Sequence, residues 1–193
     1  GRDLLVSAQT GSGKTVAFGL ALAPTLLGEA EKFAEFGAPV ALVIAPTREL
    51  ADQVAMSFEK YAKGTKLTWA LLIGGVSFKD QELKLDRGVD VLIATPGRLL
   101  DHFERGKLLM TGVQIMVVDE ADRMLDMGFI HDVKKVLALV PKEKQSLLFS
   151  ATFSDEIRDL ANGLLKDPQS VQVTPRNTTV QRITQVIHPV GRG

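Results

Sequence analysis

Two adjacent carboxylates, Asp119 and Glu120, suggest the first chemistry in this sequence. They follow the uncharged, mostly apolar run Val113 to Val118, which is typical of a buried strand, so they should emerge at its carboxyl end. There one carboxylate can hold a divalent cation while the other orients or deprotonates an attacking water. Both can reach one site only at the transition from strand to loop, because neighbouring side chains of a strand point to opposite faces. The alternative is an ordinary helix start with acidic residues in its first turn.

A glycine-rich loop lies near the N-terminus, between the apolar segment 4–6 and a segment of helical spacing that includes Phe18, Leu20 and Leu22. The loop consists of Ala8, Gln9, Thr10, Gly11, Ser12, Gly13, Lys14 and Thr15. A strand, a glycine-rich turn, a Lys-Thr pair and a helix together form a cradle for polyphosphate, held by backbone N–H groups and the helix dipole.

Individual loop residues suit separate parts of this task. Gly11 and Gly13 allow the backbone to turn several N–H groups inward. Lys14 would supply a positive charge to the β- and γ-phosphates, and the hydroxyl of Thr15, with Asp119, would hold Mg²⁺. Ala8 stands where the strict pattern has its first glycine, so a glycine-rich turn without a ligand is the alternative.

The composition is that of one ordinary globular domain. With 193 residues, 45% of them hydrophobic, the chain can bury a full core without metals or disulfides. The absence of cysteine excludes a disulfide framework and a cysteine nucleophile, and it is compatible with a reducing cytoplasm. No apolar run is long enough to cross a membrane, so we expect no membrane partner. Basic and acidic residues number 23 each, so any contact with nucleic acid must be a local surface.

Apolar runs and helical spacings alternate along the chain. Runs rich in Val, Ile and Leu, each predicted to be a buried strand, recur at residues 4–8, 40–45, 67–73, 89–94, 113–118, 147–149 and 171–173. After Pro46, apolar residues three or four apart predict an amphipathic helix. This alternation predicts an α/β fold with a mostly parallel, twisted sheet covered by helices on both faces. Every motif would then lie at the carboxyl edge of that sheet.

The C-terminal segment reads as a connector. Residues 174–179 are polar, and the alternating stretch 183–190 resembles the start of another strand. We therefore divide the chain into a domain over residues 1–175 and a linker over residues 176–193.

Further motifs make the sequence similar to one family. Beside the loop 8–15 and Asp119-Glu120-Ala121-Asp122, five segments match in order and spacing: Pro46-Thr47-Arg48-Glu49-Leu50, Gly74-Gly75, Thr95-Pro96-Gly97-Arg98, Ser150-Ala151-Thr152 and the run from Arg123 to Phe129. The chain thus resembles the first RecA-like domain of DEAD-box ATP-dependent RNA helicases over residues 1–173. The run from Arg123 and the segment 148–153 most resemble bacterial RhlE-type members.

The resemblance implies a path for the phosphate backbone of single-stranded RNA. Its residues would be Pro46, Thr47, Arg48, Glu49, Gly75, Thr95, Pro96, Gly97 and Arg98. Arginine charges, helix-start amides and glycines contact phosphates without reading bases, so binding independent of sequence is expected. Taken singly, these motifs could simply be helix-start signals, with threonine as the N-cap and proline in the first turn.

Ser150 and Thr152 would hydrogen-bond toward the turn at residues 119–122. The resemblance implies that this link, through Asp122, couples the ATP state to RNA unwinding, and it places Lys14, Asp119, Glu120, Ser150 and Thr152 in the catalytic machinery. Capping of the helix from Asp155 is the alternative role for the Ser-Ala-Thr motif. His102, His131 and His188 lack metal-ligand spacing, so we expect surface or capping roles for them.

The resemblance also implies parts that this sequence does not contain. The chain begins at Gly1 without methionine, and we expect it to be cut from a longer, monomeric protein with an upstream adenine-reading segment and a second RecA-like domain. That domain would supply arginine fingers, which are worth about 10³- to 10⁵-fold in phosphoryl transfer, so the chain alone should be nearly inactive. A P-loop kinase, a DNA translocase and a non-enzymatic nucleotide-binding module are the competing readings.

Overall fold

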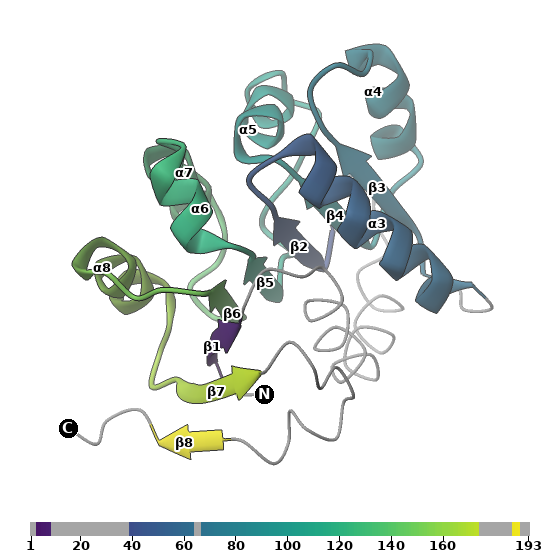
Figure 1. Cartoon of the computed structure of the whole chain (residues 1–193). Helices are drawn as coiled ribbons and strands as arrows, with labels where there is room; N and C mark the ends of the chain where they lie inside the picture. The colour runs from purple at the N-terminus through teal and green to yellow at the C-terminus, as the bar shows by residue number, and fades with distance from the viewer. Residues whose placement is uncertain (1–2, 9–38, 64–66, 174–186, 190–193) are drawn as a thin grey trace.

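The computed structural model describes residues 3–8, 39–63, 67–173 and 187–189, and these form a sheet flanked by helices (Figure 1). The strands are β1 Leu4–Ala8, β2 Ala41–Ile44, β3 Trp69–Leu72, β4 Val91–Ala94, β5 Ile115–Val118, β6 Gln145–Ser150, β7 Gln169–Val173 and β8 Ile187–Pro189. The helices are α3 Arg48–Ala62, α4 Phe78–Asp86, α5 Pro96–Glu104, α6 Ala121–Asp126, α7 Ile130–Leu139 and α8 Asp155–Leu164. All seven predicted strands are present, with shifts of a few residues at their ends.

The described strands form one sheet in the order β3-β4-β2-β5-β6-β1-β7-β8. Strands β1 to β7 pair in parallel, and β8 pairs antiparallel with β7 at the edge. The parallel α/β prediction is therefore confirmed. The strand expected within residues 183–190 is present as β8, so part of the predicted linker pairs with the sheet.

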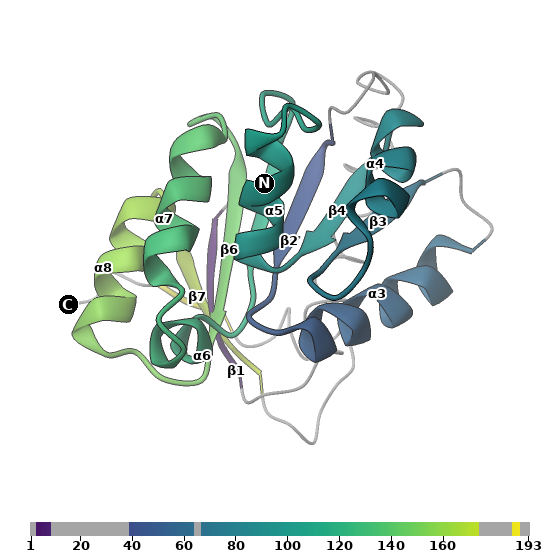
Figure 2. The same cartoon turned by 90° about the horizontal axis from the view of Figure 1, so that it is seen from above.

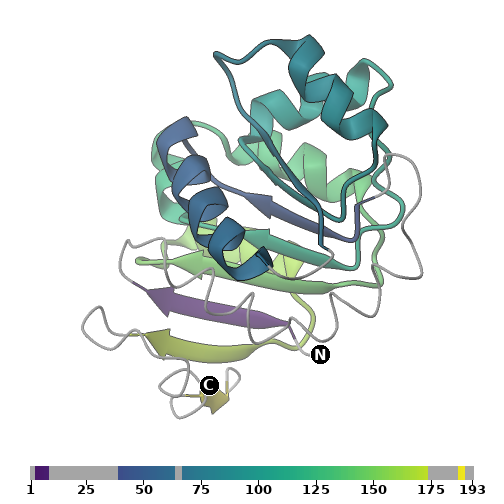
Figure 3. The same ribbon diagram turned by 90° about the vertical axis from the view of Figure 1, so that its right-hand side faces the viewer.

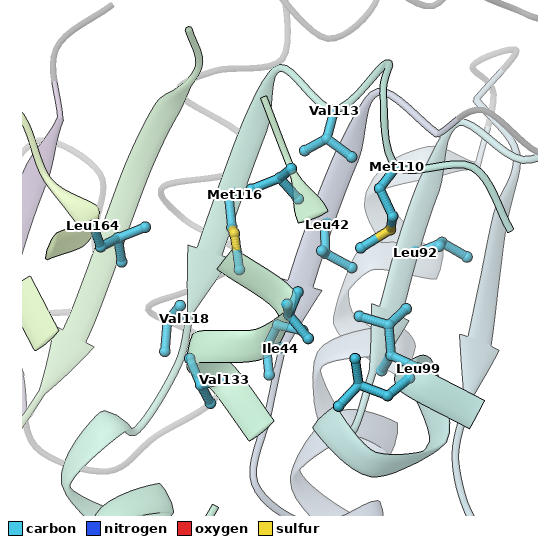
Figure 4. Close-up of a cluster of buried hydrophobic side chains, with 14 of the residues drawn as sticks. Leu42, Ile44, Leu92, Leu99, Met110, Val113, Met116, Val118, Val133 and Leu164 are labelled. Carbon is cyan, nitrogen blue, oxygen red and sulfur yellow. The ribbon is translucent and has the colours of Figure 1, made fainter. Parts of the chain in front are cut away.

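Two hydrophobic layers cover the two faces of the sheet. The larger layer lies between the sheet and helices α4 to α8, which gather on one side (Figures 2 and 4). It contains Leu42, Leu92 and Met116 from the strands, packed with Leu99 of α5 and Val133 of α7. Alternate strand residues point to the other face, as the period of a β-strand requires.

On that other face the sheet packs against α3 (Figure 3). Val54 and Phe58 of α3 contact this layer, as the spacing after Pro46 predicted, and Trp69 is partly buried there. Strands β4 and β5, buried on both faces, hold the polar residues that follow their carboxyl ends in fixed positions.

Candidate functional site

The acidic pair lies where β5 gives way to α6. The strand ends at Val118, Asp119 follows it, and Glu120 occupies the N-cap position of α6. The predicted position at a strand-to-loop transition is therefore confirmed. Asp119 donates its backbone N–H to the carbonyl of Ile44 on β2, which ties the turn to the neighbouring strand.

Glu120 has an unusual backbone and an unusual environment. Its φ of 53° and ψ of 55° lie in the left-handed region, which is uncommon for a residue other than glycine and is found preferentially at functional sites. Its side chain makes no capping hydrogen bond, so the helix-cap alternative does not explain this residue. Although Glu120 is only 6% exposed, neither carboxylate oxygen has a hydrogen-bond partner among the described residues.

Burial raises the pKa of Glu120 above its usual value, and Asp122 adds to the rise while Arg123 opposes it. A carboxylate that is buried without donors is costly, so such a group calls for a ligand or a bound water. Asp119 carries carboxylate oxygens, the ligand type that Mg²⁺ prefers. The described residues contain no cluster of three or more His, Asp or Glu side chains that could hold a metal ion.

The phosphate-loop prediction falls largely on residues that the structure does not describe. Ala8 is the last residue of β1, and residues 9–15 lie outside the described part. Strand β1 pairs with β6 and β7, so β6 separates it from β5 and the acidic pair. The loop and the acidic pair nevertheless follow parallel strands at the same edge of the sheet.

The Ser-Ala-Thr motif begins at the last residue of β6, the strand that lies between β1 and β5. Ser150 ends that strand, and its hydroxyl donates to the carbonyl of Thr152 at 2.7 Å. The hydroxyl of Thr152 donates to a carboxylate oxygen of Asp122 at 3.4 Å, so the predicted link to the acidic turn is confirmed for Thr152 but not for Ser150. The capping alternative is wrong, because Ser154 caps α8 by accepting the N–H of Ile157.

Two further motifs meet at the glycine turn after β3. Gly75 has a φ of 81°, and a Cβ built there would lie 2.8 Å from Nη1 of Arg48. A Cβ at Gly74 would lie 4.0 Å from Nη2 of Arg98. The two arginines therefore approach one glycine turn, Arg48 from the start of α3 and Arg98 from α5. The guanidinium of Arg48 occupies the space beside Gly75.

The remaining predicted RNA residues lie at the starts of α3 and α5. Thr47 accepts the N–H of Leu50 at 3.1 Å, so it serves as the N-cap of α3. Thr95, at the N-cap position of α5, makes no such side-chain bond. Pro46 and Pro96 are buried. Glu49 and Gly97 are exposed, and a Cβ at Gly97 would meet no atom within 4 Å. The start of α5 is thus open to a ligand.

Sequence reasoning missed the side chains that hold Arg98. Nη1 of Arg98 donates to the carbonyl of Val76 at 3.0 Å and to Oε1 of Gln81 at 3.4 Å. The same Oε1 lies 2.6 Å from Nε2 of His102, which is fully buried, so the surface or capping role predicted for this histidine is wrong. A polar residue on the buried face of an amphipathic helix, as Gln81 is on α4, was the available signal.

None of the described helices is both long and apolar enough to cross a membrane.

Comparison with known proteins gives the same picture as the site. The DEAD/DEAH box helicase family model matches residues 1–160. An ATP-dependent RNA helicase RhlB of Pseudomonas aeruginosa is 43% identical over 98% of this chain and 49% of its own length. The RNA helicase CrhR of Synechocystis is 42% identical over the whole chain and 38% of its own length. The chain therefore spans about half the length of these relatives or less. They are not RhlE proteins, so the RhlE-type resemblance stays a prediction.

Solved structures agree in fold. A DEAD box protein from Methanococcus jannaschii superposes with a TM-score of 0.77 at 37% identity, covering 89% of this chain and 45% of the other. A hypothetical ATP-dependent RNA helicase from Sulfolobus tokodaii gives a TM-score of 0.78 at 34% identity, covering 89% and 48%. With the family match over most of its length, the chain belongs to the DEAD/DEAH box helicase family.

Proposed function

We propose that this chain, over residues 1–175, is the N-terminal ATP-binding domain of an ATP-dependent RNA helicase, which couples Mg²⁺-ATP binding and hydrolysis to RNA binding and duplex unwinding. The observation that carries the proposal is the buried carboxylate of Glu120, which has no partner among the described residues and lies at the ligand-binding edge of a parallel sheet. The names of the relatives, RNA helicases that match almost the whole chain, support the same function.

The nucleotide would lie between the phosphate loop and the acidic turn. Backbone N–H groups of residues 8–15 would hold the phosphates, and Lys14 would neutralise their charge. Thr15 and Asp119 would hold Mg²⁺, which neutralises charge on the β- and γ-phosphates as it develops.

Glu120 would orient and deprotonate the attacking water. A general base is most effective when its pKa approaches the working pH, and burial moves the pKa of Glu120 in that direction. Glu120 has a left-handed backbone and makes no side-chain capping hydrogen bond, so helix capping does not engage its carboxylate. Thr152, bonded to Asp122, would transmit changes at the phosphates to the β6–α8 segment, with Ser150 holding the carbonyl of Thr152.

RNA would bind along the surface formed by the starts of α3 and α5 and the glycine turn after β3. The guanidinium groups of Arg48 and Arg98, both at that turn, are suited to adjacent phosphates. Thr47, Glu49, Thr95, Gly97 and the backbone shaped by Pro46 and Pro96 would complete the path. Such contacts do not read bases, so binding should be independent of sequence.

The proposal extends to the rest of the protein. Residues 176–193 would lead to a second RecA-like domain that completes the ATPase and the RNA path, in a monomeric cytoplasmic protein. The isolated 193-residue chain should bind Mg²⁺-nucleotide weakly and unwind nothing. Processive unwinding by the purified chain would contradict this part of the proposal.

Steady-state ATP hydrolysis by the full-length protein tests the function directly. The rate is measured with single-stranded RNA, with DNA of the same sequence, and without nucleic acid, for the wild type, Glu120→Gln and Glu104→Gln. Glu104 is an exposed residue of α5 and serves as the matched control. We expect RNA to stimulate turnover, and Glu120→Gln to lower it by about 10²- to 10⁴-fold while nucleotide binding persists.

Each competing reading has its own outcome. Stimulation by DNA equal to that by RNA would indicate a different P-loop motor, and transfer of phosphate to another acceptor would indicate a kinase. Nucleotide binding without turnover in the wild type would indicate a non-enzymatic module. Equal losses in Glu120→Gln and Glu104→Gln would remove Glu120 from the proposed role.

A further inference from the structure

A buried polar connection links α5 to the glycine turn through α4. His102, near the end of α5, contacts Gln81 of α4, and Gln81 contacts Arg98 at the start of α5. Gln81 is 3% exposed and His102 is fully buried, so both side chains lie out of reach of bulk water. Polar groups are buried at a cost in free energy unless their hydrogen bonds are made inside the protein.

The orientation of the Gln81 amide follows from its partners. Nε2 donates to the carbonyl of Ile73 at 2.9 Å, directly before the glycine turn. Oε1 is thereby left as the acceptor, and it faces Nε2 of His102 at 2.6 Å and Nη1 of Arg98 at 3.4 Å. A single amide thus joins the residue after β3, the last turn of α5 and the arginine.

The partners of His102 select its tautomer. Since Oε1 of Gln81 can only accept, Nε2 of His102 must carry the proton. Nδ1 is buried and has no partner among the described residues, which suits an unprotonated nitrogen. Burial lowers the pKa of His102, and nearby Arg98 lowers it further, which favours the neutral ring with Nε2 as its single donor.

The ring of Phe78 also restricts the position of the Arg98 guanidinium. Cζ of Arg98 lies 3.9 Å from the centre of this ring, and Cζ of Arg105 lies 4.4 Å from it. Phe78 also contacts the ring of His102 edge to face at 5.1 Å. Two hydrogen bonds through Nη1 and one aromatic contact therefore hold Arg98, while Nη2 lies toward Gly74.

We propose that Gln81 and His102 are positioning residues for RNA binding: together they fix the Arg98 guanidinium at the glycine turn, which Arg48 also approaches. This inference rests on the proposed function, because it takes Arg98 to contact an RNA phosphate. A guanidinium already held in place loses less conformational entropy when it binds a phosphate, so fixing it strengthens binding without adding a contact.

The packing of α4 and α5 does not by itself require these polar groups. Leu85 of α4 and Leu99 and Leu100 of α5 already belong to the larger hydrophobic layer. An apolar pair at positions 81 and 102 would pack there without any need for buried hydrogen bonds. The polar pair instead supplies an acceptor within reach of Arg98.

The test is a double-mutant cycle on RNA affinity in the full-length protein. Binding of a fluorescein-labelled single-stranded oligo(U) is measured for the wild type, Gln81→Met, Arg98→Ala and the double variant, with an ATP analogue bound. Methionine keeps the size of Gln81 but has no amide. We expect Arg98→Ala to weaken binding about tenfold and Gln81→Met about three- to tenfold. In the Arg98→Ala background, Gln81→Met should have no further effect.

Each other outcome is decisive. Equal factors for Gln81→Met in the presence and absence of Arg98 would overturn the inference while leaving the RNA path intact. Unchanged affinity in Gln81→Met would also overturn it. If Arg98→Ala binds RNA normally, both the role of Arg98 and the inference fall. Leu83→Gln, an exposed change on α4, should behave as the wild type.

A second pair of variants covers the case in which Gln81→Met does not fold. His102→Phe removes the N–H donor, whereas His102→Gln places an amide N–H where Nε2 lies. We expect His102→Phe to weaken RNA binding about threefold and His102→Gln to restore it, with equal nucleotide affinity and melting temperature in both. Equal RNA affinity in the two variants would overturn the inference, because only a positioning role depends on the donor.

Discussion

Buried carboxylates lie both where the parallel strands begin and where they end, and their hydrogen bonding differs between these two edges of the sheet. At the edge where the parallel strands begin, Asp3 and Asp90 are 6% and 9% exposed. At the edge where they end, Asp119 and Glu120 are 5% and 6% exposed. Burial is therefore the same, and Glu120 differs from Asp3 and Asp90 in the hydrogen-bond donors that surround its carboxylate.

The carboxylates at the first edge have backbone donors. Asp3 accepts the N–H of Ser146 at 2.9 Å and that of Lys166 at 2.6 Å, which joins β1 to the segments that begin β6 and β7. Asp90 accepts both the N–H and the hydroxyl of Thr68, which joins β4 to the segment that begins β3. Charge-assisted bonds of this kind stabilise the fold.

Glu120, at the second edge, has no donor among the described residues and a left-handed backbone. Leaving a buried charge without partners lowers stability, and such groups persist where a ligand completes them. The comparison indicates that this domain places hydrogen-bonded carboxylates where strands begin and an unpartnered one, Glu120, where β5 ends. Substitutions at the two edges should therefore change the free energy of unfolding with opposite signs.

The largest effect is expected at Asp3. Asp3→Ala leaves the N–H groups of Ser146 and Lys166 without their acceptor, so we expect a loss of about 3 kcal/mol in the free energy of unfolding. Urea denaturation of the purified domain measures it. Asp52→Ala, an exposed aspartate of α3, is the control and should change stability by less than about 0.5 kcal/mol. Equal stability of the two variants would remove the distinction between the edges.

Asp90 should show a smaller, graded loss. Asp90→Ala removes the acceptor of Thr68 and is expected to cost about 2 kcal/mol, whereas Asp90→Asn keeps a neutral acceptor and should cost about 1 kcal/mol. The backbone bonds of Asp90 to the start of β2 persist in both variants. Urea midpoints in the order wild type, Asn, Ala check the prediction, and a reversed order would contradict it.

Glu120→Gln should stabilise the domain by about 1 kcal/mol at neutral pH in buffer without metal or nucleotide. Because burial raises the pKa of Glu120 above its usual 4.5, the wild type loses stability as the pH rises through the raised pKa, and glutamine has no such loss. The gain should therefore vanish below pH 4.5.

Thermal melting at a series of pH values measures this gain, with Glu104→Gln as the control. A destabilised Glu120→Gln variant at neutral pH would mean that the carboxylate is satisfied in the folded domain. In that case the contrast between the two edges would fail.

The sequence could predict the positions of the motifs but not the partners of their side chains. An apolar run followed by Asp119 or Thr95 is a local pattern, so it reports correctly that these residues follow strands. The partners of Asp3 and Asp90 lie 143 and 22 residues or more away, and an aspartate before a strand looks like any loop residue. The strand order, with β6 between β1 and β5, is likewise set by long-range packing.

His102 shows the same limit and supplies the last prediction. It has no neighbour in the sequence that marks it as buried, yet Gln81, 21 residues away, fixes it in the core. Burial and then Arg98, with Arg105, lower its pKa below the usual 6.5, while Glu82 and Asp101 oppose this. Its contribution to stability is therefore complete above pH 6.5 and is lost as the pH falls through the lowered pKa.

The wild type should thus lose about 1 kcal/mol more than His102→Gln when the pH is lowered from about 7.5 to about 5. His131→Gln, an exposed histidine of α7, is the matched control and should follow the wild type. Urea denaturation at both pH values measures the difference. A parallel pH dependence of the wild type and His102→Gln would mean that the ring is protonated or hydrated in the folded domain. The Oε1 of Gln81 would then no longer face a single neutral donor, and the connection from His102 to Arg98 would lose its fixed geometry.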